Sequence, residues 1–297
     1  MTDEALIAGV ELGGTKCIAS LARGRTILRR ERWPTATPDT LGLISAELAR
    51  WMAEEPVAAI GIASFGPLML DPAHPRFGHM GRTPKPGWAG ADILGHFRQR
   101  FDLPIAIDTD VNGAALAEGQ WGAAQGCGAH IYATVGTGVG LGVVMDGRPL
   151  HGRMHPEAGH MRIRRQAGDD FPGGCPSHGD CIEGLVSGPG LMARAGRPLA
   201  DVDDDDLLWR RVAMDLGEWA AMLILALSPQ RFVIGGGVPQ LRPALLPMIR
   251  RHAGDLLNDY LDDLDEAVME RLIVPPGLGE DAGPLGAVML GRAALGR

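Results

Sequence analysis

Four side chains between residues 151 and 189 have the types and spacing of a metal site. His160 precedes a C-x2-H-x2-C run formed by Cys175, His178 and Cys181. Two imidazoles and two thiolates can hold a tetrahedral structural Zn2+, and soft thiolate ligands favour zinc over magnesium or calcium. One loop can present three of these ligands while the fourth arrives from the preceding segment. The pattern therefore predicts a loop braced by zinc.

Two glutamates flank the predicted metal ligands. Glu157 lies three residues before His160, and Glu183 lies two residues after Cys181. A metal that pins the loop would hold both carboxylates in fixed positions, as hydrogen bonding to a polyhydroxylated ligand requires. The alternative for the cysteines is a disulfide between Cys175 and Cys181, which needs an oxidising compartment.

Length, composition and charge exclude several classes of protein. The chain of 297 residues can form two domains or one large two-lobed fold, and its hydrophobic content of 45% suffices for a real core. Its net charge of −8, without a block of basic residues, argues against a nucleic-acid partner. No uncharged apolar run is long enough for a membrane span. The acidic N-terminus lacks the features of a signal peptide, so we expect a cytoplasmic protein.

Three glycine-rich turns follow strand-like apolar segments. They are Gly13, Gly14, Thr15 and Lys16 after residues 6–12; Gly136, Thr137 and Gly138 after 129–132; and Gly235, Gly236 and Gly237 after 231–234. Because glycine lacks Cβ, such turns let backbone amides approach a phosphate or a flat base, although each can also be an ordinary turn. Strands are expected again at 17–22 and 141–145, so the second half repeats the plan of the first.

A polar stretch at residues 108–112 follows a predicted strand at 105–107 and begins a predicted helix at 111–121. A carboxylate at the C-terminal end of a strand lies where α/β proteins bind ligands, which makes Asp110 a candidate site residue. Helix capping is the alternative, but it needs only one such residue. The turn at 64–67 also follows a buried strand, 57–63, and its backbone amides can face a ligand.

Periodicity and turn residues predict the remaining elements. Helices are expected at 37–53 and 92–101, and a long helix is expected to start at the acidic residues 203–206 and end at 227. An amphipathic segment at 245–264, a strand at 272–275 and a helix from 281 or 282 to 295 follow.

The order of these motifs resembles that of the ROK family of sugar kinases and sugar-sensing repressors, most closely its bacterial zinc-containing fructokinases. The motifs are ELGGTK at 11–16, SFGP at 64–67, TPKPGW at 83–88, TDVN at 109–112, HPEAGH at 155–160 and CPSHGDCIE at 175–183. The resemblance covers essentially the whole chain. It implies an α/β, actin-like ATPase (hexokinase/Hsp70-type) fold of two lobes with a central cleft. The expected lobes are residues 1–115, joined by a C-terminal helix at about 283–297, and residues 116–282, which carry the zinc-binding loop.

The resemblance also implies an activity, an ATP-dependent hexose kinase that transfers the γ-phosphoryl group to the 6-hydroxyl of D-fructose. Asp110 would be the general base, and Mg2+ and a structural Zn2+ would be bound. The implied sugar-binding residues are Gly66, Pro67, Thr109, Asp110, Glu157, His160 and Glu183. The turns at 13–16 and 136–138 would contact the phosphates of ATP, and the turn at 235–237 its adenosine. A homodimer is expected.

The chemistry of phosphoryl transfer agrees with these roles. The reaction needs in-line positioning, charge neutralisation by Mg2+ and one group that accepts the sugar hydroxyl proton. Closure of the lobes would exclude water, which competes as the acceptor.

Three positions depart from the common pattern of the family. His178 stands in place of a middle cysteine, Glu11 in place of aspartate, and Thr109 in place of the asparagine that precedes the base in glucokinase-like members. The TDVN motif and the C-x2-H-x2-C run favour fructose. The alternatives are a glucokinase, a mannokinase or an N-acetylmannosamine kinase. A sugar-responsive transcription regulator belongs to another class and would need an added winged-helix region, for which we expect no room before the first hairpin.

Overall fold

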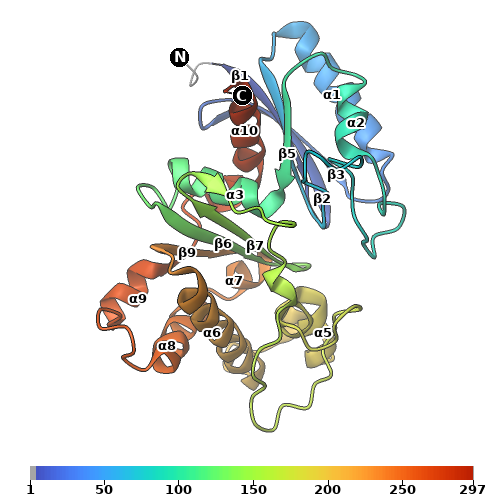
Figure 1. Ribbon diagram of the computed structural model, residues 1–297. Helices are drawn as coiled ribbons and strands as arrows, with labels where there is room; N and C mark the ends of the chain where they lie inside the picture. Colours follow the sequence, from blue (N-terminus) through green and yellow to red (C-terminus); the bar gives the residue numbers. More distant parts are fainter. Residues whose placement is uncertain (1–4, 297) are drawn as a thin grey trace. The chain divides into compact units, whose positions relative to one another are not determined.

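The computed structural model describes residues 5–296 as two compact units (Figure 1). The first unit contains the described residues up to Gln125, Gly142–Pro156, and the residues from Gly277 onward. The second contains Gly126–Leu141 and Glu157–Pro276. Two parts of the predictions lie outside the described residues: residues 1–4, which belong to the expected N-terminal lobe, and residue 297, which ends the expected C-terminal helix. The expected boundary at 115/116 would cut a helix that lies wholly in the first unit.

The sheet of the first unit has the strand order β3-β2-β1-β4-β5. Its strands are β1 (Leu6–Leu12), β2 (Lys16–Arg23), β3 (Thr26–Pro34), β4 (Ala59–Ser64) and β5 (Ile105–Thr109). β1 and β2 form the expected antiparallel hairpin, whereas β1, β4 and β5 run parallel. The apolar runs of β1 and β4 are almost wholly buried, as central parallel strands are. β3, which the sequence analysis did not predict, is an edge strand rich in arginine.

The helices of this unit agree with their apolar spacing. α1 (Thr40–Glu54) buries the expected stripe of Leu41, Ile44, Leu48 and Trp51. α2 (Ile93–Arg98) is shorter than the predicted helix at 92–101, and α3 (Asp110–Trp121) follows β5 directly. The helix α10 (Ala282–Leu295) is present where it was expected.

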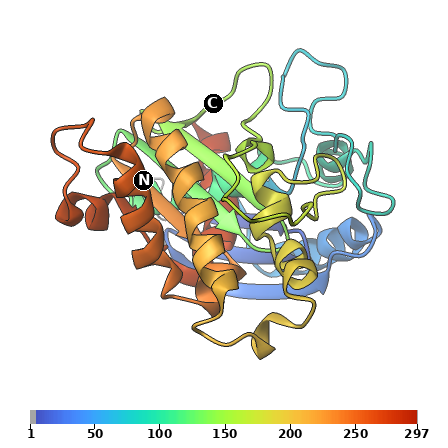
Figure 2. The same cartoon turned by 90° about the horizontal axis from the view of Figure 1, so that it is seen from below.

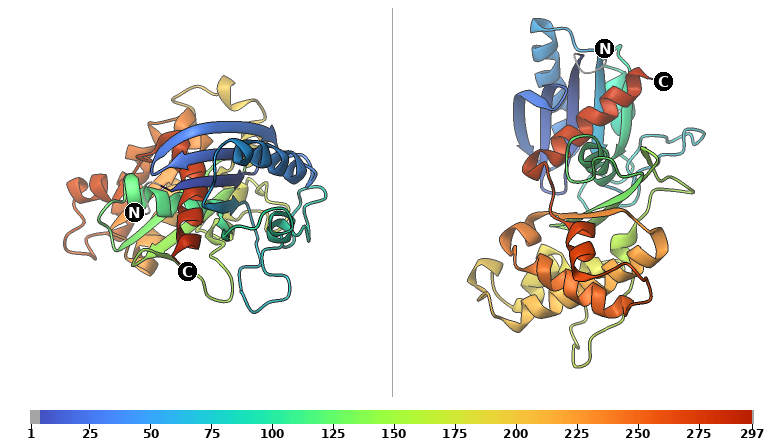
Figure 3. Two further views of the ribbon diagram at one scale, coloured as in Figure 1. Left: turned by 90° about the horizontal axis from the view of Figure 1, so that it is seen from above. Right: turned by 90° about the vertical axis from the view of Figure 1, so that its left-hand side faces the viewer.

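α10 crosses the sheet of the first unit at very close range. It contacts β1, β4 and α3 and runs obliquely across the strands, as Figure 3 shows. A Cβ atom on Gly61 of β4 would lie 1.8 Å from the carbonyl oxygen of Ala287. Only glycine therefore permits this approach of helix to strand. Leu285, Val288 and Leu290 of α10 are buried as a result.

The second sheet has the order β10-β9-β6-β7-β8. Its strands are β6 (Ala129–Val135), β7 (Val139–Met145), β8 (Arg148–Pro149), β9 (Arg231–Gly235) and β10 (Ile273–Val274). Read from β8, this order matches β3-β2-β1-β4-β5, and β6 runs parallel to β9 as β1 does to β4. The duplicated plan predicted from the glycine turns is confirmed.

Two long helices pack together in the second unit. α6 (Leu207–Leu227) lies beside α8 (Leu245–Leu257), as Figure 2 shows. Asp206, the last residue of the acidic run, caps α6 by accepting a hydrogen bond from the Leu208 amide, so the run lies at the start of the helix as predicted. The short segments are η1 (Ala158–His160), α4 (Ile182–Val186), α5 (Gly188–Ala195), η2 (Leu199–Asp201), α7 (Gly237–Leu241) and η3 (Gly279–Asp281).

The prediction for residues 245–275 was partly wrong. α8 ends at Leu257, and a separate helix, α9 (Glu266–Leu272), precedes a strand of only two residues. Asp265 begins α9 by accepting a hydrogen bond from the Val268 amide. This capping interaction favours a helix in a stretch to which the sequence analysis assigned no element before its strand at 272–275. Among the described residues, no helix has the length and apolar character that crossing a membrane requires.

A buried carboxylate at the end of α3 fastens two distant parts of the first unit. Glu118 accepts hydrogen bonds from the amides of Ala123 at 2.6 Å, Gly277 at 3.0 Å and Leu278 at 3.0 Å. The chain passes from one unit to the other next to these residues, after Gln125 and before Gly277. Glu118 therefore anchors these two of the four passages between the units on the side of the first unit.

Candidate functional site

The four predicted metal ligands lie together in the second unit. The nearest ligand atoms of His160, Cys175, His178 and Cys181 all lie within 4.8 Å of one another. His160 Nδ1 is 3.8 Å from Cys175 Sγ and 3.7 Å from Cys181 Sγ, and His178 Nδ1 is 3.9 Å from Cys175 Sγ. Ligands of one tetrahedral zinc ion are separated by about 3.6 Å, so the four atoms fit such an ion. All four cysteines of the chain are free, which excludes the disulfide alternative in this structure.

Backbone hydrogen bonds shape the loop that carries three of these ligands. Cys175 and Gly179 exchange two hydrogen bonds across a tight turn, 3.1 and 2.9 Å long, and this turn brings His178 toward Cys175. The Ile182 amide donates to Met161 O, so the end of the loop is joined to the segment after His160. Burial raises the pKa of the Cys181 thiol to about 11, and ligation as a thiolate would therefore release a proton.

A buried ionic network, which the sequence analysis missed, holds the start of the loop. Arg194 of α5 pairs with Asp169 of the loop and, at 3.0 Å, with Asp215 of α6. The three side chains are at most 4% exposed. Arg165 also contacts Asp169 at 3.0 Å and Asp180 at 3.4 Å. Arg194 lies 25 residues from Asp169 and 21 from Asp215, and no local motif predicts that these three residues meet.

Glu183 lies between the metal ligands and a glycine turn. Its Oε1 is 4.0 Å from His160 Nδ1, and its Oε2 accepts a hydrogen bond from the Val139 amide at 3.0 Å. A Cβ atom on Gly159 would lie 1.8 Å from Val139 O. The segment 155–160 can therefore approach the turn at 136–138 only because residue 159 is glycine. The predicted sugar-binding residues Glu183 and His160 therefore lie next to the turn at 136–138. Glu157 precedes η1, and its carbonyl accepts from the His160 amide at 3.0 Å.

Two of the predicted nucleotide-binding turns are neighbours in the second unit. β6 pairs with β9 so that Thr134 lies opposite Gly235, and a Cβ atom on Gly136 would lie 3.8 Å from the Gly237 amide nitrogen. Gly236 has a φ of +97°, a conformation that favours glycine. The Gly188 amide donates a hydrogen bond to Gly136 O at 2.7 Å, which fixes the start of the turn at 136–138.

Asp110 is the first residue of α3 in the first unit. Thr109 caps the helix: its Oγ1 accepts from the Asn112 amide at 3.2 Å. Capping thus engages Thr109, a predicted sugar-binding residue that is only 3% exposed, and leaves Asp110 for another role. Burial raises the pKa of the partly exposed Asp110 to about 6. Burial and the charge of Asp110 raise the pKa of nearby Glu11 to about 7.

The two other predicted turns of the first unit are held by backbone contacts. In the turn at 13–16, the Gly13 amide donates to Lys16 O at 3.0 Å, and Thr35 Oγ1 donates to Gly13 O at 2.7 Å. The turn at 64–67 contains a cis peptide bond between Gly66 and Pro67, and Pro67 O accepts from the Gly81 amide.

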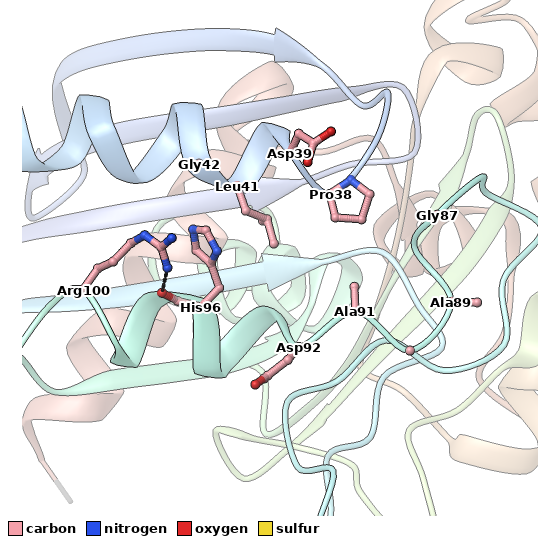
Figure 4. A pocket seen from close by; sticks show the side chains of 11 residues that line it. Pro38, Asp39, Leu41, Gly42, Gly87, Ala89, Ala91, Asp92, His96 and Arg100 are labelled. Atoms are coloured by element: carbon pink, nitrogen blue, oxygen red, sulfur yellow. Dashed lines mark hydrogen bonds between the residues drawn. The ribbon is translucent and has the colours of Figure 1, made fainter.

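The structure thus gathers the predicted residues into two groups, one in each unit. The first unit holds Asp110, Thr109 and the turns at 13–16 and 64–67, and the second holds the metal ligands, Glu157, Glu183 and the turns at 136–138 and 235–237. A separate cavity of about 620 Å3 in the first unit, drawn in Figure 4, is lined by α1, α2 and the loop before α2. None of the predicted site residues lines this cavity.

Comparison with known proteins extends over almost the whole chain. The sequence matches the ROK family over residues 7–294. It is 42% identical to a fructokinase of Zymomonas mobilis over 98% of both chains, and 39% identical to a fructokinase of Pediococcus pentosaceus over 98% of this chain and 99% of the relative.

Solved structures agree with this relationship. A ROK hexokinase from Thermus thermophilus has a TM-score of 0.76 and 27% identity, and covers 98% of this chain and 99% of its own. A ROK family glucokinase from Streptomyces griseus, solved with glucose and AMPPNP, has a TM-score of 0.75 and 26% identity, with coverage of 97% and 100%. The predicted α/β fold of the actin-like ATPase class and the family resemblance are both confirmed. The chain belongs to the ROK family.

Proposed function

We propose that the protein is an ATP-dependent hexose kinase, and specifically a fructokinase that phosphorylates the 6-hydroxyl of D-fructose. The observation that carries the proposal is the similarity to the Zymomonas mobilis fructokinase, at 42% identity over 98% of each chain. The two solved ROK enzymes that share the fold are named a hexokinase and a glucokinase, and the glucokinase was solved with a sugar and an ATP analogue.

Asp110 is the proposed general base of the reaction. It accepts the proton of the sugar 6-hydroxyl while O6 bonds to the γ-phosphorus and the bond to the β,γ-bridging oxygen breaks, which releases ADP. A base with a pKa of about 6 is ionised at neutral pH and can still accept a proton efficiently. Its position at the first turn of α3 keeps the carboxylate available for the substrate.

The sugar and the nucleotide have separate proposed contacts. Glu157, His160 and Glu183, together with Thr109 and the Gly66–Pro67 turn, bind the sugar hydroxyls. The turns at 13–16 and 136–138 bind the phosphates, and the turn at 235–237 binds the adenosine. Support for the nucleotide contacts comes from the adjacency of the last two turns, because phosphates and adenosine are parts of one ligand.

Two metals have distinct proposed roles. Zn2+ at His160, Cys175, His178 and Cys181 is structural, because four protein ligands close its coordination. Mg2+ supplies charge neutralisation on the phosphates when ATP is bound. We further propose that the enzyme acts in the cytoplasm as a homodimer.

A coupled assay of ADP release tests the proposal. Fructose, glucose, mannose and N-acetylmannosamine are compared with the same zinc-replete protein, with water alone as the control acceptor. We expect kcat/KM for fructose to exceed that for every other sugar by at least about tenfold. Preference for another of these sugars would contradict the fructokinase assignment.

The regulator alternative makes a different prediction. Absence of turnover on all four sugars, together with specific retardation of DNA at moderate salt, would favour a sugar-responsive regulator over a kinase. We expect turnover and no specific retardation.

A further inference from the structure

We propose that His151 and His155 are positioning residues that join the turn carrying the general base to the Gly66–Pro67 turn. Both histidines belong to the segment between β8 and Glu157. They lie four residues apart, and each contacts a different part of the first unit. The inference rests on the proposed function only for its effect on turnover.

His151 contacts the carboxylate that braces the first turn of α3. Its Nε2 is 3.0 Å from Asp108 Oδ2, and Asp108 is only 5% exposed. The same carboxylate accepts, through Oδ1, from the Thr109 amide at 2.7 Å and from Asn112 Nδ2 at 2.8 Å. Because carboxylate oxygens accept hydrogen bonds, the imidazole Nε2–H is the donor. Asp108 thus links His151 to the residues on both sides of Asp110.

His155 contacts the other turn. Its Nε2 accepts a hydrogen bond from the Leu68 amide at 3.0 Å, and Leu68 directly follows Pro67. This nitrogen can accept only when the imidazole is neutral. His155 is 4% exposed, and burial lowers the pKa of its imidazole, which keeps the ring neutral. The hydrogen bond therefore fixes the backbone where the Gly66–Pro67 turn ends.

The two contacts have one consequence for the proposed site. A single short segment sets the position of the base turn and of a sugar-binding turn, and then continues directly into Glu157. Errors in such positioning are costly, because a displacement of about 1 Å can lower a rate about a hundredfold. Loss of the His155 contact should weaken sugar binding, whereas loss of the His151 contact should slow the step that uses Asp110.

Paired substitutions at His155 test its part of the proposal. His155→Leu removes the acceptor, and we expect the KM for fructose to rise about tenfold, since the unpaired Leu68 amide no longer fixes the backbone at the end of the Gly66–Pro67 turn. The KM for ATP should change less than twofold. His155→Gln keeps an acceptor for the Leu68 amide and should restore most of the affinity for fructose. A rise in both KM values, or a defect in the Gln variant as large as in the Leu variant, would overturn the role.

Substitutions at His151 test the other part. His151→Phe removes the donor to Asp108, and we expect kcat to fall about tenfold with little change in the KM for fructose. His151→Gln retains an N–H donor and should restore most of kcat. Equal kcat values in the Phe variant and the native enzyme would overturn the role of His151.

His74 supplies a matched control. Its Nδ1 also accepts from a backbone amide, that of Arg76, at 3.1 Å, but the residue lies on an exposed loop. His74→Leu should leave both kinetic constants within twofold. Zinc content and melting temperature are measured for every variant, so that a folding defect is recognised.

Amide hydrogen exchange separates this inference from the proposed function. In the substrate-free protein, His155→Leu should speed exchange of the Leu68 amide at least about tenfold, while His74→Leu should leave it unchanged. This measurement needs no turnover. If the native protein phosphorylates no hexose, the proposed function fails, yet exchange still tests the contact. Unchanged exchange in His155→Leu would overturn the positioning role itself.

Discussion

Asp110 shows how the start of one helix can prepare a carboxylate for chemistry. Thr109 caps α3, and Asp108 is engaged by the Thr109 amide and by Asn112. These contacts leave the carboxylate of Asp110 with a hydrogen bond from the Val111 amide and a pKa raised by burial to about 6. Burial in a position that solvent can still reach is a common feature of catalytic acids and bases.

The raised pKa predicts the pH dependence of catalysis. The ionised form of Asp110 is lost as the pH falls through about 6, so kcat/KM for the sugar should decrease about tenfold per pH unit below that value. Initial rates between pH 5 and 8 test this expectation. A profile that stays flat down to pH 5 would contradict the proposed role of Asp110 as the general base.

Asp110→Asn supplies the matched variant. We expect kcat to fall by at least about a hundredfold. The folded pKa lies above the ordinary value of 3.8, so the ionised carboxylate destabilises the fold above about pH 6, and this penalty disappears as the pH falls toward 4. The melting temperature of the Asn variant at pH 8 should therefore equal or exceed that of the native protein. A large decrease would mean that unfolding causes the loss of activity.

The position of Asp110 could be predicted from the sequence, but its surroundings could not. A polar residue directly after an apolar strand is a local signal, which a single sequence contains. The contact between Asp108 and His151 joins residues 43 positions apart and depends on the tertiary fold. The same limit applies to Glu118, two of whose hydrogen-bond partners lie 159 and 160 residues away.

At the scale of elements, two sets of side chains hold the loop that carries Cys175, His178 and Cys181: the predicted metal ligands and the side chains of a buried ionic network. The spacing of Cys175, His178 and Cys181 predicted a cluster, and the structure brings these residues and His160 together. The loop is also held by ion pairs that no motif announces. These two sets of contacts can be tested independently, because different residues make them.

Removal of one metal ligand should release the metal and loosen the loop. We expect Cys181→Ser to lose bound zinc during gel filtration, with a lower melting temperature and a higher KM for the sugar. Zinc is measured by mass spectrometry against protein concentration. Cys127→Ser is the control, because Cys127 lies outside the cluster. Stoichiometric zinc in Cys181→Ser would contradict the assignment of this ligand.

Removal of the central arginine of the buried network should destabilise the second unit strongly. Arg194→Met leaves Asp169 and Asp215 buried without their shared partner, which should cost about 3–5 kcal/mol of unfolding free energy. Arg197→Met breaks an exposed pair with Asp206 and should cost less than about 1 kcal/mol. Urea unfolding of both variants measures the difference. Equal losses in the two variants would show that the buried pairs contribute no more than an exposed one.

Some elements departed from their sequence patterns for physical reasons. β3 has a charged sequence without clear alternation, but an edge strand tolerates charges because one side of it faces solvent. α9 was missed because its seven residues are too few for a clear helical period, and only the cap at Asp265 marks its start. α1 and α6, which are longer and regularly spaced, were predicted within a few residues of their bounds.

At the scale of the whole molecule, the repeated pair of strands was predictable because each copy has a glycine turn between two apolar segments, whereas the order of all five strands in each sheet was not. The division into units was harder to predict, because residues 142–156 belong to the first unit although the chain on both sides belongs to the second. The sequence alone does not show that residues 142–156 return to the first unit. Their place in it is set by tertiary contacts such as those of His151 with Asp108 and of His155 with Leu68.

The close packing of α10 on the first sheet has a consequence for biosynthesis. The ribosome makes β1 and β4 long before α10, the helix that covers them. Until α10 has been made, the face of β4 around Gly61 lacks its partner, so the first unit cannot complete its core. We expect ribosome-bound chains that stop before Ala282 to be cleaved rapidly by protease within residues 5–125, and chains that extend past Leu295 through the exit tunnel to resist. Protection of the shorter chains would mean that β1 and β4 become stable without α10.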